Sequence, residues 1–124
     1  MFKDLFRFSQ KEISLAFKLA KLKNQTNGLK LLQFPIEEIK KLKIEEFAKT
    51  FENQIKENTG KILIIISGKV GKAHERNQLR RRIKNIFYEQ KLYAKPFISI
   101  LITYKQALNL TFDQLKQFLV ESFE

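Results

Sequence analysis

The chain has 124 residues, enough for one compact domain, and 44% of them are hydrophobic, so a packed core is expected. Its 24 Lys and Arg residues outnumber 13 Asp and Glu residues, and the formal charge of +11 favours a polyanionic partner. The absence of cysteine excludes disulfides, thiolate metal sites and cysteine nucleophiles, and the one histidine, His74, cannot hold a zinc ion alone.

The first predicted element is a helix that begins after Ser9. Ser9 and Glu12 have the spacing of a capping box, in which each side chain bonds the backbone amide of the other residue. Apolar residues then recur at helical spacing: Ile13, Ala16, Phe17 and Ala20. We expect residues 24–28 to end this helix, with Gly28 free to adopt a positive φ. Residues 29–34 then read as a short strand.

Residues 35–59 are predicted to form a helical segment. Pro35 ends the preceding strand and suits the first turn of a helix. The apolar positions that indicate one broken helix or two short ones are Ile36, Ile39, Leu42, Phe47, Ala48, Phe51 and Ile55. Asn58, Thr59 and Gly60 close the segment. Its five Lys and six Glu residues give a formal charge of −1, so all the excess positive charge lies elsewhere in the chain.

The second half of the chain alternates strands with helices. Residues 62–66 form a continuous aliphatic run, which is typical of a strand buried on both faces. Gly68 and Gly71 punctuate the following turn. A helix with one narrow apolar stripe follows, and the stripe consists of Leu79, Ile83, Ile86 and Phe87. After Pro96, residues 97–104 read as another buried strand.

The final helix is predicted to begin at a second capping box. Thr111 and Gln114 supply the box. The expected apolar side of the helix consists of Phe112, Leu115, Phe118, Leu119 and Phe123. The predicted order is therefore helix, strand, helical segment, strand, helix, strand and helix. This order indicates an α+β fold in which helices pack on a small sheet, as one domain over residues 1–124 with a helical insert at 35–59.

The segment most informative about function is residues 69–84, which hold seven basic residues and one acid, Glu75. At helical spacing the side chains of Arg80, Lys84, Asn77 and Arg81 fall on faces beside and opposite the apolar stripe. Arg76 lies closer to that stripe, so it is expected at the helix start or reaching back over the turn.

These residue types suit nucleic acid. The guanidinium of arginine can donate two hydrogen bonds to one phosphate, and the amide of Asn77 could read a base edge or a sugar hydroxyl. A solvated basic helix face is the plainer alternative. The density of arginine in an otherwise lysine-rich chain and the flanking glycine turn favour RNA or DNA binding.

The same segment resembles the arginine–asparagine–arginine motif of the bacterial ribonuclease P protein family. The residues that carry the resemblance are Ser67, Lys69, Val70, Gly71, Ala73, Arg76, Asn77, Arg80, Arg81 and Lys84. The early helix, the strand after Pro96 and the final helix are similar to the family's order. Residues 35–59 differ, because they are longer and more helical than the connection that the family usually carries there.

The resemblance implies a ribosomal-protein-like sandwich of the type α-β-β-β-α-β-α, with a left-handed crossover around the basic helix. It also implies the protein subunit of an endoribonuclease whose RNA removes the 5′ leader of precursor tRNA with Mg²⁺. The Mg²⁺ would be held mainly by the RNA and substrate. The residues expected to face the catalytic RNA are Lys69, Lys72, Arg76, Asn77, Arg80, Arg81 and Lys84. Those matching a cleft for the single-stranded leader are Ile13, Phe17 and Ser67.

Other functions stay open at this point. A ribosomal-protein-like or general RNA-binding module would bind RNA without altering precursor tRNA cleavage. A protein-only nuclease would need clustered carboxylates, and the basic segment offers only Glu75. Residues 35–59 could contact a protein partner through Phe47, Phe51 and Ile55, although those side chains could equally join the core. No stretch approaches the roughly 18 apolar residues of a membrane span, and a cytoplasmic protein is expected.

Overall fold

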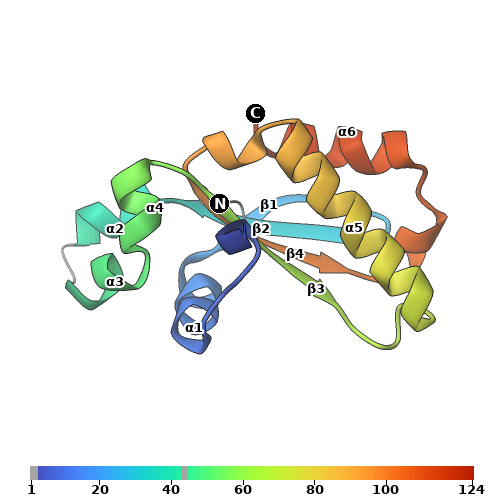
Figure 1. Cartoon of the computed structure of the whole chain (residues 1–124), viewed down its shortest axis with the longest axis horizontal. Coiled ribbons are helices and arrows are strands. Elements are labelled where there is room, and N and C mark those ends of the chain that lie inside the picture. The colour runs from blue at the N-terminus through green and yellow to red at the C-terminus, as the bar shows by residue number, and fades with distance from the viewer. Residues whose placement is uncertain (1–2, 43–44) are drawn as a thin grey trace.

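The computed structural model describes residues 3–42 and 45–124, and within them four strands form one sheet with helices on both faces (Figure 1). In chain order the elements are η1 (Lys3–Leu5), α1 (Gln10–Leu19), β1 (Lys21–Thr26), β2 (Leu29–Pro35), α2 (Glu37–Leu42), α3 (Glu45–Thr50), α4 (Glu52–Glu57), β3 (Lys61–Ile66), α5 (Ala73–Glu89), η2 (Leu92–Ala94), β4 (Phe97–Thr103), η3 (Lys105–Asn109) and α6 (Phe112–Ser122).

The sheet is mixed, with the strand order β1-β2-β4-β3. β1 pairs with β2 and β2 pairs with β4 in antiparallel fashion, whereas β3 and β4 run parallel. Parallel neighbours need a crossover connection, and α5 provides it. In Figure 1, α5 crosses in front of the sheet while β3 and β4 both point to the right, with β4 above β3. This geometry makes the crossover left-handed, against the general preference and as the family resemblance implied.

The α+β class and the helices at both ends of the chain are confirmed. Ser9 and Glu12 form the expected capping box at α1, and Thr111 and Gln114 form the one at α6. Within the described residues, the segment 35–59 is helical after β2 ends, as expected, and contains α2, α3 and α4. Asn58 ends α4 with a positive φ of 55°.

The residue patterns did not predict the strand β1. The α-β-β-β-α-β-α order that the family resemblance implied does include it. α1 ends at Leu19 instead of continuing towards residues 24–28. Residues 21–26 are mostly exposed and polar because β1 lies at the sheet edge, so they lack the apolar alternation that predicts a strand. Gly28 turns the β1–β2 hairpin with a φ of +98°, and the backbone of Ala107 leaves no room there for a side chain.

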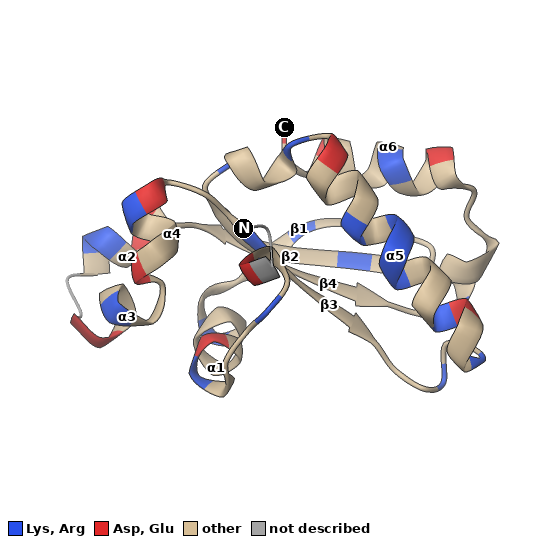
Figure 2. Cartoon of the chain, viewed as in Figure 1, with Lys and Arg blue, Asp and Glu red and all other residues tan. Residues whose placement is uncertain are grey.

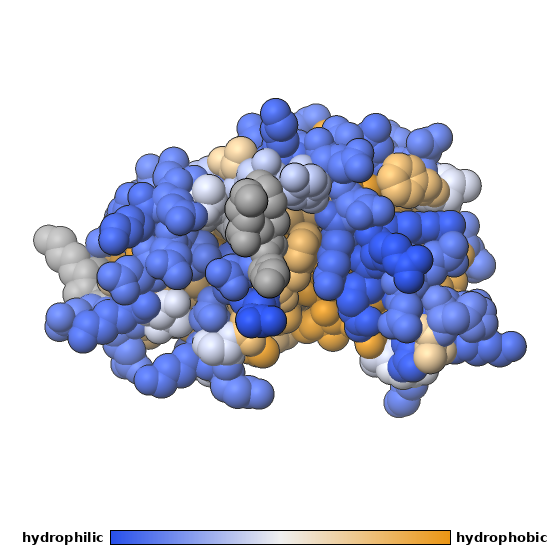
Figure 3. All heavy atoms as spheres, in the orientation of Figure 1, coloured by the Kyte–Doolittle hydropathy of each residue, from blue (hydrophilic) through white to orange (hydrophobic). Residues whose placement is uncertain are grey.

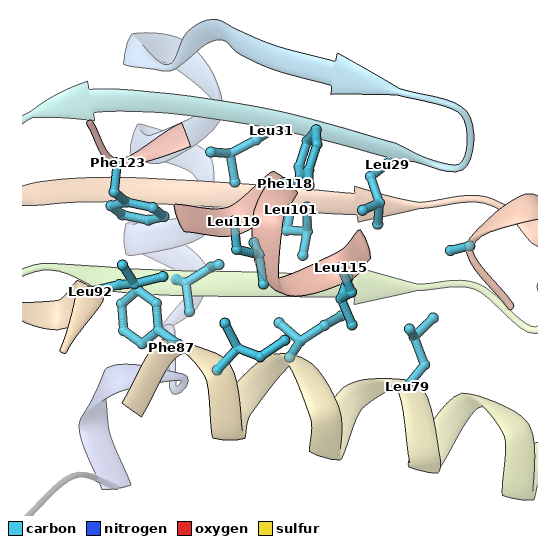
Figure 4. Packing of buried hydrophobic residues seen from close by; sticks show 14 of the residues in the cluster. Leu29, Leu31, Leu79, Phe87, Leu92, Leu101, Leu115, Phe118, Leu119 and Phe123 are labelled. Carbon is cyan, nitrogen blue, oxygen red and sulfur yellow. The ribbon is translucent and has the colours of Figure 1, made fainter. Parts of the chain in front are cut away.

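One hydrophobic cluster fills the space between the sheet and the pair α5 and α6 (Figure 4). The expected stripe of α5 is buried in it: Leu79, Ile83, Ile86 and Phe87. Phe87 contacts the ring of Phe123 edge to face at a centroid distance of 5.8 Å. Phe112 does not join its predicted apolar side, because it is 44% exposed at the first position of α6.

A second cluster lies on the opposite face of the sheet, under α1 and the insert. Phe51 of the insert is fully buried and contacts Phe34 of β2 edge to face, with ring centroids 6.0 Å apart. Phe47 and Ile55 are half-buried against the same cluster. These three side chains therefore belong mainly to the core. This was the plainer expectation for them, the other being contact with a protein partner.

β3 is not buried on both faces as the aliphatic run predicted. It is an edge strand, and after Ile62 the side chains of residues 63–66 are only half-buried. Pro35 also differs from expectation, because it is the last residue of β2 and α2 begins two residues later. The half-buried side chains of β3 therefore leave part of the apolar surface of this strand accessible to solvent.

A buried ion pair joins the first residue of β3 to α1. The Nζ atom of Lys61 lies 2.6 Å from the Oε2 atom of Glu12, and Lys61 is only 3% exposed. The same ammonium group lies 4.4 Å from the ring centroid of Phe8. Taking a charge out of water is costly unless a partner compensates it, so each member of the pair depends on the other.

We expect Glu12→Gln to lower the free energy of unfolding by up to about 3–5 kcal/mol, because it leaves the Lys61 charge without its partner. A glutamine can still complete the capping box with Ser9, so the helix start is preserved. Urea unfolding is the measurement. The exposed Glu89→Gln is the control, and Glu12→Gln combined with Lys61→Met should recover much of the stability. A single variant as stable as the wild type would contradict the argument.

Candidate nucleic-acid interface

The basic helix α5 begins at a well-defined cap. The backbone amide of Lys72 donates a 2.9 Å hydrogen bond to the Oε1 atom of Glu75, and the amide of Arg76 donates to the carbonyl oxygen of Lys72 at 3.0 Å. Glu75 is also the acid of the first turn, where the helix dipole favours negative charge. The cap fixes where the helix starts and hence which residues share a face.

One flank of α5 carries a row of cations beside the buried stripe. Arg76, Arg80 and Lys84 recur every four residues, so their attachment points follow one another along the helix at about 6 Å intervals. All three are half-buried, which is common for long cationic side chains that lay their stems on apolar surface and keep their charged ends in water. Figure 2 shows basic residues along the face of α5 that points away from the sheet.

Each end of this row is located by a contact. The guanidinium of Arg76 reaches back over the turn towards Gly68, as expected from its position. A Cβ atom added at Gly68 would lie 3.2 Å from its Nη1 atom. Nη1 of Arg80 lies 3.3 Å from Oδ1 of Asn77. Nζ of Lys84 lies 5.3 Å from the ring centroid of Phe6. The row therefore runs from the turn after β3 to the N-terminal segment.

The remaining basic residues are distributed around this row. Arg81 and Asn77 are positioned towards the solvent side of α5, and Lys69 and Lys72 are exposed in the turn that precedes it. Arg82 lies on the other flank, where it lines a small recess together with Leu108 of η3. The structure thus places the predicted RNA-binding residues on one flank, the solvent face and the leading turn, and it separates Arg82 from them.

Ile13 and Phe17, which the family resemblance assigns to a leader cleft, lie together on one flank of α1. Leu15, on the opposite flank, lines a recess beside Phe47 of the insert. Ile13 is half-buried, and Phe17 is 47% exposed although it is a large aromatic residue. Four residues apart on a helix, the two side chains are neighbours. The flank that carries them therefore faces away from the insert.

The uncovered part of the sheet on this face is apolar with one cation. Ile65 of β3 pairs in register with Ile102 of β4, and Ile102 pairs with Lys30 of β2. Paired residues share a face of the sheet, and all three are half-buried. Figure 3 shows apolar residues in a recess between α1 and the loop that leads from β3 into α5. Ser67 is exposed directly after β3, at the border of this recess.

Two residues of this region are not among those predicted from the sequence. Lys30 lies on the uncovered face, and Tyr104 is 45% exposed just after β4, at the same end of the sheet as Ser67. The alternation along β2 could have placed Lys30 on the face opposite Leu29 and Leu31. The exposure of Tyr104 has no sequence signal, because it depends on the end of β4.

The described residues offer no protein metal site. No group of three or more His, Cys, Asp or Glu side chains gathers among residues 3–42 and 45–124 in a way that could hold a metal ion. In the same part of the chain, no helix has the length and apolar character needed to cross a membrane.

A row of arginine and lysine beside an apolar recess suits a nucleic-acid strand. Cations contact phosphates, and an exposed aromatic can stack on a base without selecting its sequence. The turn at residues 67–72 joins the two surfaces, because it leaves the strand that borders the recess and enters the helix that carries the row.

Comparisons with known proteins agree on one family. The family model described as Ribonuclease P matches residues 2–124. A ribonuclease P protein component from Onion yellows phytoplasma is 40% identical over 62 residues, which are 49% of this chain and 44% of that relative. The match thus spans less than half of the relative's length.

Solved structures show the same fold at low sequence identity. The ribonuclease P protein of Staphylococcus aureus superposes with a TM-score of 0.68 at 17% identity, covering 95% of this chain and 91% of that one. The ribonuclease P protein of Thermotoga maritima gives a TM-score of 0.65 at 19% identity, covering 94% of this chain and 92% of that one.

Proposed function

The chain belongs to the ribonuclease P family, and from this membership we propose that it is the protein subunit of a ribonuclease P. In this role it binds the catalytic RNA and the 5′ leader of precursor tRNA and supports removal of the leader. The observation that carries the proposal is the row of Arg76, Arg80 and Lys84 held beside an uncovered apolar recess.

The catalytic RNA is assigned to α5 and its leading turn. The cation row can follow a phosphate backbone, and guanidinium groups donate to phosphate oxygens in pairs. Asn77 already accepts a bond from Arg80, which orients its amide and leaves its two N–H donors for a sugar or base. Lys69 and Lys72 extend the positive surface around the turn.

The single-stranded leader is assigned to the recess beside α1. Phe17 offers an exposed ring for stacking, and Ile13 with the aliphatic floor excludes water from one side of the strand. Lys30 supplies a cation on this floor, where it could neutralise a leader phosphate. Ser67 borders both surfaces and can donate one hydrogen bond.

Catalysis belongs to the RNA subunit in this proposal. Mg²⁺ is assigned to the RNA and the substrate, as the family resemblance implies. The contribution of the protein is to hold the two RNAs, which raises the effective concentration of substrate at the catalytic RNA. The natural setting of the complex is the cytoplasm.

Arg80→Gln should weaken binding of the catalytic RNA and lower the slope of log affinity against log salt by about 0.7–0.9 for each phosphate that the side chain neutralises. Arg82→Gln is the matched control, because it removes the same charge from the other flank of the same helix. Filter binding over a range of salt concentrations measures both. Equal slopes for the two variants would contradict the assignment of the row.

Phe17→Ala should weaken binding of leader-bearing precursor tRNA by about 1–3 kcal/mol, the range for a base stacked on an aromatic ring. Mature tRNA should bind as it does to the wild type. Phe112→Ala is the control, since Phe112 is almost equally exposed but lies on α6, which packs on the opposite face of the sheet. An equal weakening with mature tRNA would remove the leader from this recess.

The subunit role itself is tested by precursor tRNA cleavage with the cognate ribonuclease P RNA at low Mg²⁺. The expected result is faster cleavage with the protein than without it, and none by the protein alone. Tight RNA binding with no effect on cleavage would instead favour a ribosomal-protein-like or general RNA-binding module.

A further inference from the structure

Another recess, distinct from those described above, lies on the opposite flank of α1 from Ile13 and Phe17. The insert forms one of its walls. Its volume is about 450 Å³, which is within the range of small-molecule sites. The N-terminal segment contributes Arg7 and Phe8, the insert contributes Lys49 and Gln54, and Lys61 of β3 lies at its base. The recess is separate from the surfaces assigned above, so it is a candidate for a function of its own.

Gln54 is the most informative residue in this recess. Gln54 is only 9% exposed, yet within the described parts of the chain its side-chain amide has no hydrogen-bond partner. Its backbone carbonyl oxygen is occupied by the amide of Thr59 at 3.1 Å. A buried amide without a hydrogen-bond partner costs free energy. Among the described residues, every side-chain nitrogen or oxygen atom that is fully enclosed has such a partner. The amide of Gln54 therefore opens into the recess, where a ligand or water must satisfy it.

The charges around the recess cancel. The acids Asp4, Glu12 and Glu52 face the cations Arg7, Lys49 and Lys61. The buried cation, Lys61, is already paired with Glu12, so the interior is not a trap for a free phosphate. Arg7 and Lys49 lie at the rim, where their charged ends can reach solvent. The acids Asp4 and Glu52 are exposed there as well, so the recess as a whole suits a ligand with a neutral, hydrogen-bonding body.

We propose that this recess binds one unpaired nucleobase of an RNA strand, with the amide of Gln54 bonding the base edge and Arg7 and Lys49 contacting the adjacent phosphates. The inference rests on the proposed RNA-binding function and adds a subsite to it. An amide offers a donor beside an acceptor, which matches the edges of bases that single strands leave unpaired. The half-buried ring of Phe8 supplies an apolar wall.

The placement gives the insert a role in RNA binding despite its negative charge. α1 separates the recess from the leader-cleft flank, so a strand that lies beside Ile13 and Phe17 would continue over the N-terminal end of α1 to reach Gln54. The insert would then allow the protein to contact one more nucleotide of the bound strand at the end of the cleft.

The test is NMR titration of the full chain with a single-stranded RNA pentanucleotide and with adenosine and uridine 5′-monophosphates. In the wild-type protein the side-chain NH₂ signals of Gln54 should shift on addition of the RNA. Gln54→Met keeps the length of the side chain but removes the amide, and it should weaken pentanucleotide binding roughly tenfold. Gln117→Met, an exposed position on α6, should leave binding unchanged.

The outcomes separate this inference from the proposed function. If Phe17→Ala weakens binding while Gln54→Met does not, and the Gln54 signals stay in place, the recess holds only water and the inference is overturned. If Gln54→Met fails to fold, the wild-type Gln54 signals still decide the matter. If precursor tRNA cleavage is unaffected by the protein although the Gln54 signals shift, the nucleobase site stands and the ribonuclease P role falls.

Discussion

The burial of the α5 stripe against the sheet is the interaction on which the arrangement of the basic surface depends. Leu79, Ile83, Ile86 and Phe87 occupy one side of the helix and are nearly or fully buried. Because residues on a helix have fixed angular positions, this burial decides where every other side chain of α5 points. A rotation of α5 that exposed the stripe would also direct the cation row into the core, so packing and charge placement reinforce each other.

The parallel pairing of β3 with β4 sets the second constraint. A parallel pair needs a crossover, and the crossover begins at the carboxyl end of β3. The glycine turn and the start of α5 therefore lie at the end of the sheet where β3 leaves its aliphatic side chains half-buried. An edge strand with an aliphatic surface invites association with other chains, and an RNA strand in the recess would cover that surface.

The other face of the sheet divides into a closed part and an open part. The insert packs Phe51 over the end of the sheet where β2 finishes and β3 begins, and α1 lies beside it. The buried pair of Lys61 and Glu12 ties α1 to β3 at this boundary. The near-neutral insert leaves the excess positive charge to the rest of the chain.

Much of the fold and of the candidate site was predictable from local patterns. Capping boxes, the stripe of α5 and the arginine-rich segment are encoded within a few turns of helix, so their positions follow from residue spacing alone. β1 could not be predicted from its residues. It is an exposed edge strand, so its sequence lacks the alternation of apolar and polar residues that packing against a core requires. The exposure of Phe112 and the half-burial of β3 likewise depend on neighbours that are distant in sequence.

Sequence by itself therefore determined the types of the main helices and the position of the basic segment, and it predicted a polyanionic partner, since charge and periodicity are local properties. Tertiary structure alone decided that Arg82 lines a recess with Leu108 of η3, and that Lys30 shares a surface with Ile65 and Ile102. It also decided that Gln54 opens into a recess beside Lys61. These relations arise when strands pair and helices pack, and residue spacing along the chain does not contain them.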